Sequence, residues 1–134
     1  MPVADTELLF LLNPRDPRHD HALRIIEELK GRLYVPDTAL LEFEVTLRSR
    51  GRSSHQVMKA FMGLKKIFID YDIKEICTLD SDAIFLHLDL MRQYKLSYFD
   101  SLLAASAIRV DNIIVSDDKI FDYIVGLKRI PITK

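Results

Sequence analysis

Residues Leu96 to Asp118 read LSYFDSLLAASAIRVDNIIVSDD, and this stretch decides how the rest of the chain is organised. It begins a helix that carries an acid, Asp100, and continues through small residues into an apolar strand that ends in Asp117 and Asp118. In α/β folds, ligands bind outside the carboxyl ends of strands, where carboxylates can hold a divalent metal ion. Whether this chain builds such a site depends on acids elsewhere in the sequence.

Length and composition bound the class of protein. The 134 residues are expected to form one domain, 1–134, with a single core. Hydrophobic residues make up 49% of the chain, which is typical of globular proteins. No apolar run approaches the roughly 20 residues of a membrane span, and the N-terminus lacks the features of a signal peptide. We therefore expect a cytoplasmic protein without a membrane segment.

The lone Cys77 excludes an internal disulfide and argues against a thiolate zinc site. Its apolar surroundings, IKEICTL, predict that it is buried as a small hydrophobic residue. The net charge of −1 provides no general attraction to nucleic acid.

Strands and helices are expected to alternate along the chain. Strands are predicted at 3–5, 33–35, 112–116 and 129–133, and helices at 6–12, 17–29, 38–50, from 53 or 54 to about 67, 81–93, 98–109 and 119–125. The stretch 68–79 alternates imperfectly and fits either a strand or an extended connection. This order predicts a three-layer α/β/α fold with a central parallel sheet of four or five strands.

Two predicted helices carry apolar residues that need a partner. Met58 and Met62 widen the apolar face of the helix that starts near Ser53, which suits either a dimer surface or a helix between two layers. In the helix 81–93, Leu88 is predicted to face inward, and His87 on the same stripe is predicted to be a core histidine.

Each acid at a predicted helix start has a purely structural explanation. Ser97 followed by Asp100 fits a capping box, in which the side chains satisfy the helix's own amides. The acids after Ser116 could complement a helix dipole, and Asp5 before Thr6 could be another N-cap.

Taken together, the acids favour a metal site. Asp5 ends the first predicted strand and Asp118 follows another, while Asp100 and either Glu42 or Glu44 fall in the first turns of helices. These positions are candidates to converge in the crevice outside the carboxyl ends of parallel strands. Several carboxylates in one crevice require a cation, and Mg²⁺ or Mn²⁺ prefers such oxygen ligands.

Four segments in this order carry a resemblance to a known family. They are VADTELL at 3–9, VPDTALLEF at 35–43, SYFDSLLAASA at 97–107 and IIVSDDKIF at 113–121. The chain resembles a PIN-domain ribonuclease of the VapC-like toxin kind over nearly its whole length. The resemblance implies a PIN-like fold and an acidic pocket that binds Mg²⁺ or Mn²⁺ and hydrolyses RNA.

The resemblance also assigns individual residues. The family's four acids, which bind the metal and carry the catalysis, fall on Asp5, Glu42, Asp100 and Asp118. Thr6 and Ser116 fall at the hydroxyl positions and are expected to contact the substrate. Glu44 remains the alternative for the second acid, because it lies nearer the centre of the apolar arc of its helix. Asp117 stands at a position that is usually not acidic, and it could assist or replace the fourth acid as a metal ligand.

A basic segment and the resemblance together suggest the partners. Residues 45–69 contain no acid but carry Arg48, Arg50, Arg52, Lys59, Lys65 and Lys66. These cations fit either an RNA-binding surface, with Arg48 and Arg50 as the substrate contacts, or an ordinary solvated face. The resemblance implies an RNA substrate and a possible cognate antitoxin, and we also expect a homodimer. The alternatives are a PIN nuclease of RNA processing and a module that binds RNA or protein without cleaving.

Overall fold

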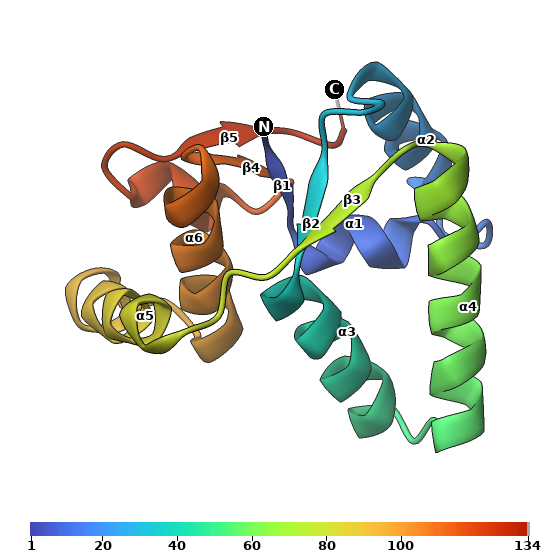
Figure 1. Cartoon of the computed structure of the whole chain (residues 1–134), viewed down its shortest axis with the longest axis horizontal. Coiled ribbons are helices and arrows are strands. Elements are labelled where there is room, and N and C mark those ends of the chain that lie inside the picture. Colours follow the sequence, from blue (N-terminus) through green and yellow to red (C-terminus); the bar gives the residue numbers. More distant parts are fainter. Residues whose placement is uncertain (134) are drawn as a thin grey trace.

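Five short parallel strands form the central sheet of the computed structural model, which describes residues 1–133 (Figure 1). The strands are β1 Val3–Ala4, β2 Tyr34–Pro36, β3 Lys74–Ile76, β4 Ile113–Val115 and β5 Lys128–Ile130. Their order across the sheet is β3-β2-β1-β4-β5, and Val3 of the central strand pairs with Tyr34 on one side and Ile114 on the other. The predicted parallel sheet is confirmed.

Helices lie on both sides of this sheet. They are α1 Thr6–Leu11, α2 His19–Glu28, α3 Asp37–Ser49, α4 Ser54–Asp70, α5 Ser81–Tyr94, α6 Tyr98–Val110 and the 3₁₀-helix η1 Lys119–Tyr123. Figure 1 shows α5 and α6 on one side of the sheet and α2 and α4 on the other, while α3 runs away from the edge where β2 ends. The predicted three-layer arrangement is confirmed. Among the helices in residues 1–133, none has the length and apolar character needed to cross a bilayer.

Local sequence signals explain where several helices begin. Ser53 and Gln56 form a reciprocal capping box, in which the Ser53 hydroxyl accepts the Gln56 amide and the Gln56 side chain accepts the Ser53 amide. The Ser97 hydroxyl accepts the amide of Asp100 at 3.2 Å, so the predicted cap of α6 is also present. These caps satisfy helix amides that would otherwise have no partner.

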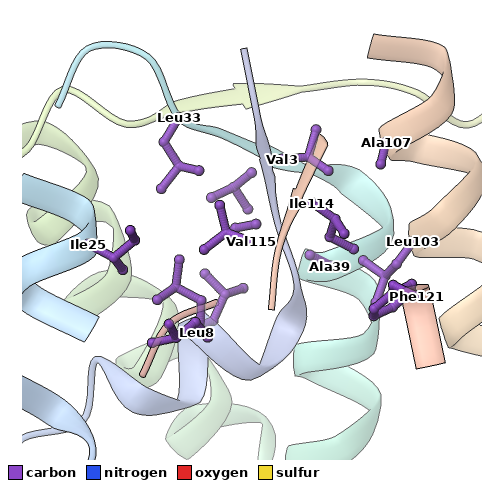
Figure 2. Close-up of a cluster of buried hydrophobic side chains, with 14 of the residues drawn as sticks. Val3, Leu8, Ile25, Leu33, Ala39, Leu103, Ala107, Ile114, Val115 and Phe121 are labelled. Carbon is purple, nitrogen blue, oxygen red and sulfur yellow. The ribbon is translucent and has the colours of Figure 1, made fainter. Parts of the chain in front are cut away.

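The core lies on both faces of the sheet (Figure 2). Neighbouring strand residues point to opposite faces, so Ile114 packs with Leu103 and Phe121, whereas Val115 lies with Leu8 and Ile25. The small residues of α6 that the sequence singled out are almost fully buried, which lets this helix approach the sheet closely. This packing fixes the start of α6 relative to the strand ends.

The structure decides one open stretch and corrects two expectations. The undecided stretch 68–79 divides, because α4 continues to Asp70 and only Lys74–Ile76 form a strand. Cys77 is exposed and not buried, because it lies just beyond the short edge strand β3. Leu88 is 53% exposed, because the buried face of α5 is centred on His87, Ala83 and Leu90.

Candidate functional site

An acidic pocket of about 410 Å³ lies at the edge of the sheet where β1 and β4 end. It is lined by all four predicted acids, by Thr6, and by further residues that the sequence did not single out; the four acids are Asp5, Glu42, Asp100 and Asp118. They come from the end of β1, the second turn of α3, the first turn of α6 and the N-cap of η1. The structure therefore brings together acids that are up to 113 positions apart in the chain.

A buried serine links the two strand ends at the pocket. The Ser116 hydroxyl donates a hydrogen bond to Oδ2 of Asp5 at 2.5 Å and accepts one from the amide of Asp118 at 3.0 Å. Ser116 is 0% exposed, so its side chain has no surface for a substrate. In this structure Ser116 therefore contacts Asp5 and Asp118 and does not itself line the pocket.

Burial and neighbouring charges act on Asp5. The Asp5 side chain is buried, and loss of hydration raises its pKa to about 7 from an ordinary value of 3.8. The hydrogen bond from Ser116 opposes this rise, while the negative charges of Glu7, Glu42 and Asp100 add to it. Without a counterion, Asp5 therefore holds a proton up to about neutral pH.

The same causes act on two more acids of the pocket. Burial raises the pKa of Glu42; the neighbouring Thr6 hydroxyl opposes the rise and the charge of Asp100 adds to it. Burial also raises the pKa of Asp100; the hydrogen bond with Ser97 opposes the rise and the charge of Asp118 adds to it. Repulsion among these carboxylates makes the pocket attractive to a cation.

The oxygen atoms of the pocket fit a hard cation. Besides the four carboxylates, the pocket contains the Thr6 hydroxyl, which is buried and makes no hydrogen bond of normal geometry. Buried hydroxyls nearly always have a partner, so this oxygen is available to a ligand or to an ordered water. As placed in residues 1–133, no three Asp, Glu, His or Cys side chains converge tightly enough to coordinate one ion.

Glu42 and Glu44 have separate places in the structure. Glu42 lines the acidic pocket, whereas Glu44 accepts a hydrogen bond from Nε of Arg48 at 3.1 Å, one turn along α3. Arg48 and Glu44 both line a different cavity, between α3 and α4. The structure thus places Glu42 with the other acids, and it separates Arg48 from them.

Asp117 has its oxygens engaged by the chain itself. Its carboxylate accepts the amides of Ile132 and Thr133 at 2.7 and 2.9 Å and the Thr133 hydroxyl at 3.0 Å. Burial raises its pKa, but the hydrogen bonds of Thr133 and Ile132 and the charge of Arg18 outweigh burial and hold the pKa below its ordinary value. Asp117 is not among the residues that line the acidic pocket.

Two arginines contribute positive charge to the pocket. The predicted Arg50 lines it, with its guanidinium 4.9 Å from the centre of the Phe10 ring. Arg18 also lines it, 3.3 Å from a Glu7 oxygen and 3.4 Å from an Asp117 oxygen. Arg18 could not be singled out from the sequence, because it lies in the Pro-containing turn before α2 and reaches the site only through the path of that turn.

A larger cavity of about 730 Å³ opens between α3 and α4. Its apolar lining includes Leu40, Leu41, Val57, Met58, Phe61 and Met62. Met58 and Met62 are about two-thirds exposed. This α3–α4 groove combines the features that the sequence raised as a possible dimer surface.

Comparison with known proteins gives one family and a set of similar folds. The family described as PIN domain matches residues 3–127. Similar solved structures include a toxin–antitoxin complex from Klebsiella pneumoniae, with 19% identity, 95% of each chain covered and a TM-score of 0.69. Another is VapBC2 from Rickettsia felis bound to a promoter DNA fragment, with 18% identity, 96% of each chain covered and a TM-score of 0.71.

A third similar structure is VapC20 of Mycobacterium tuberculosis, described as a Sarcin-Ricin loop cleaving toxin. It has 16% identity and a TM-score of 0.68, with 91% of this chain and 93% of that chain covered. No curated protein sequence gives a significant match. At these identities, the likeness to solved structures concerns the fold.

Proposed function

This chain belongs to the PIN domain family, and from that premise we propose that it is a metal-dependent endoribonuclease and the toxin of a type II toxin–antitoxin pair. The observation that carries the proposal is the pocket that is lined by four carboxylates together with the buried Thr6 hydroxyl. The similar folds include a toxin–antitoxin complex, a VapBC2 structure and one toxin described as cleaving the Sarcin-Ricin loop, which supports the role of a cleaving toxin.

The four acids would hold Mg²⁺ or Mn²⁺, with Asp5, Glu42 and Asp100 as the central ligands and Asp118 as the outer one. A bound ion would supply a water of lowered pKa and would neutralise charge on the reacting phosphate. Ser116 keeps Asp5 in place through its 2.5 Å hydrogen bond. Each acid thus comes to the pocket on a different element.

Positive charge at the pocket would hold the RNA backbone. Arg50 and Arg18 line the pocket beside the acids, where they can contact phosphates that flank the scissile bond. Thr6, in the same lining, offers a hydroxyl to the substrate or to a water molecule. Arg48 pairs with Glu44 on the other side of α3 and does not contribute here.

A cleavage assay with a matched control tests this function. The purified chain is incubated with RNA and Mn²⁺, with and without a chelator. We expect Asp100→Asn to abolish metal-dependent cleavage, because a neutral amide is a poor ligand for a hard cation. Asp89→Asn is the control, because Asp89 lies on the exposed face of α5, paired with Arg92. Full activity in Asp100→Asn would contradict the proposal.

The toxin role has its own test. A toxin should arrest growth when expressed alone and should be rescued by a small protein encoded beside it, with which it forms a stable complex. Cleavage without growth arrest would favour a PIN nuclease of RNA processing. RNA binding without Mn²⁺-dependent cleavage would favour a non-cleaving module.

We also propose that a second copy of the chain covers the α3–α4 groove. The same chain offers a matching surface on α5, where Phe85 and Leu88 are 68% and 53% exposed. Asp82, one turn before Phe85, adds negative charge to that surface, while Lys65 lines the groove. In such a dimer the apolar ridge of one copy would fill the apolar groove of the other, because each identical chain offers both surfaces.

Light scattering during size-exclusion chromatography tests the dimer. We expect a dimer for the unmodified chain and a monomer for Met62→Glu, which places a charge in the groove. Lys59→Glu, on the same helix but outside the groove lining, is the matched control. A monomeric unmodified chain would contradict this pairing.

A further inference from the structure

A buried histidine of α5 contacts the helix that carries Asp100. His87 is 1% exposed, and its Nδ1 lies 2.6 Å from the hydroxyl oxygen of Ser101 in α6. Its ring also packs edge-on against Tyr98, with the ring centres 4.9 Å apart. Figure 1 shows α5 and α6 side by side, and they form the most extensive helix–helix contact of the described chain.

The partners of the Ser101 hydroxyl determine which group donates in its hydrogen bond with His87. The Ser101 hydroxyl has one proton, and it lies 2.9 Å from the carbonyl oxygen of Ser97 and 2.8 Å from that of Tyr98. These carbonyls can only accept, so the serine proton is used there. His87 therefore donates from Nδ1 to the Ser101 oxygen, and burial, which lowers the pKa of His87, keeps the ring neutral.

The bond acts on the first turn of α6. Ser97, Tyr98 and Ser101 belong to the cap and first turn of that helix, and Asp100 lies among them. The Asp100 amide is held by the Ser97 hydroxyl, and the Ser101 amide by the Ser97 carbonyl at 3.0 Å. The first turn of a helix lacks the full set of internal hydrogen bonds, so it is the part that needs support from outside.

We propose that His87 is a positioning residue, which clamps the first turn of α6 through Ser101 so that the Asp100 carboxylate stays directed into the acidic pocket. The clamp opposes the repulsion that Asp100 experiences from Asp118 before any cation is bound. His87 itself does not line the pocket, so it touches neither the reacting phosphate nor the ion. The effect of the clamp on metal binding rests on the proposed function, but the clamp itself is a property of the metal-free chain.

The first experiment measures the clamp without metal, by amide hydrogen exchange of Asp100 and Ser101 in the full chain. We expect His87→Leu and Ser101→Ala to lose protection at these two amides. His87→Asn should restore most of it, because an asparagine amide can place a donor near the position of Nδ1. Ser101→Ala removes the same hydrogen bond with little change in volume. The clamp can therefore still be tested if His87→Leu fails to fold.

The second experiment measures Mn²⁺ affinity by titration calorimetry. Loss of a group that orients a metal ligand commonly weakens metal binding by about 10- to 100-fold, and we expect about 10-fold for His87→Leu and for Ser101→Ala. The double variant should bind Mn²⁺ no more weakly than the weaker-binding single variant, because the two substitutions remove the same hydrogen bond. Leu90→Ala, at another buried position of α5, should lower thermal stability but leave Mn²⁺ affinity unchanged.

The outcomes separate the clamp from the proposed function. Unchanged exchange at Asp100 and Ser101 in His87→Leu, or an affinity loss in Leu90→Ala equal to that in His87→Leu, would overturn the positioning role. Failure of His87→Asn to restore protection would overturn it as well. If the unmodified chain bound no Mn²⁺ while the variants still lost protection at Asp100 and Ser101, the proposed function would fail and the clamp would stand.

Discussion

At the scale of single residues, Asp5 shows that the site holds a carboxyl group where burial and neighbouring acids oppose its ionisation. A pKa of about 7 means that burial destabilises the ionised form of the Asp5 carboxyl group. The Ser116 hydroxyl stabilises that form with only one hydrogen bond. Such perturbed carboxyls are typical of functional sites. The sequence could indicate Asp5 from its place at a strand end, but the serine that holds it appeared there only as a substrate contact.

The shifted pKa of Asp5 predicts how stability depends on pH. Its folded-state pKa of about 7 lies above its ordinary value of 3.8, so between these values the folded chain holds a proton that the unfolded chain releases. The metal-free chain should therefore lose up to a few kcal/mol of unfolding free energy as pH rises from about 4 to 7. Urea unfolding at pH 5 and pH 8 checks this.

The control for this effect is Asp5→Asn, which carries no titrating group. Its unfolding free energy should fall less between pH 5 and pH 8, and Mn²⁺ should stabilise the unmodified chain more at pH 8 than at pH 5. Equal pH dependence in the two proteins would show that Asp5 titrates normally.

Adjacent acids at 117 and 118 should differ in what their loss costs. Asp117→Asn removes a carboxylate that accepts three hydrogen bonds from Ile132 and Thr133, and should cost about 1–3 kcal/mol of stability. Asp118→Asn should leave stability nearly unchanged but reduce cleavage. Denaturation curves and cleavage rates of both variants decide, and an inactive but stable Asp117→Asn would make Asp117 a ligand after all.

At the scale of elements, the sequence located caps better than strand ends. Ser53 and Ser97 begin α4 and α6 as predicted, because capping depends on residues three positions apart. Strand β3 stayed undecided between a strand and an extended connection, because it lies at the sheet edge with Lys74 and Glu75 exposed and has no buried alternation. The prediction that Leu88 faces inward was wrong for a related reason, because the packing of α5 against α6 decides which face of α5 is buried.

The two caps also provide a matched pair of variants. Ser53→Ala and Ser97→Ala should each cost about 1 kcal/mol of stability, because each removes an N-cap hydrogen bond. Only Ser97 begins the helix that carries Asp100, so only Ser97→Ala should also slow cleavage. Equal cleavage rates at equal stability would mean that the cap of α6 does not support the site.

At the scale of the whole molecule, the sequence predicted that the four acids lie together, but it did not predict the other charged residues that line the pocket. Parallel strands bring their carboxyl ends to one edge, so acids at those ends meet regardless of detail. Glu7 and Arg18 join them because the turn after α1 folds back toward β4. The choice of Glu42 over Glu44 likewise depended on which side of α3 faces α1 and α6.

The position of β1 at the centre of the sheet has a consequence for biosynthesis. Strand β1 pairs on one side with β4, which is synthesised more than a hundred residues after it. Until then Asp5 has no Ser116 beside it, and Asp118 does not yet exist. A nascent or truncated chain that ends before residue 113 therefore lacks the assembled acidic pocket, because neither Ser116 nor Asp118 is present to complete it.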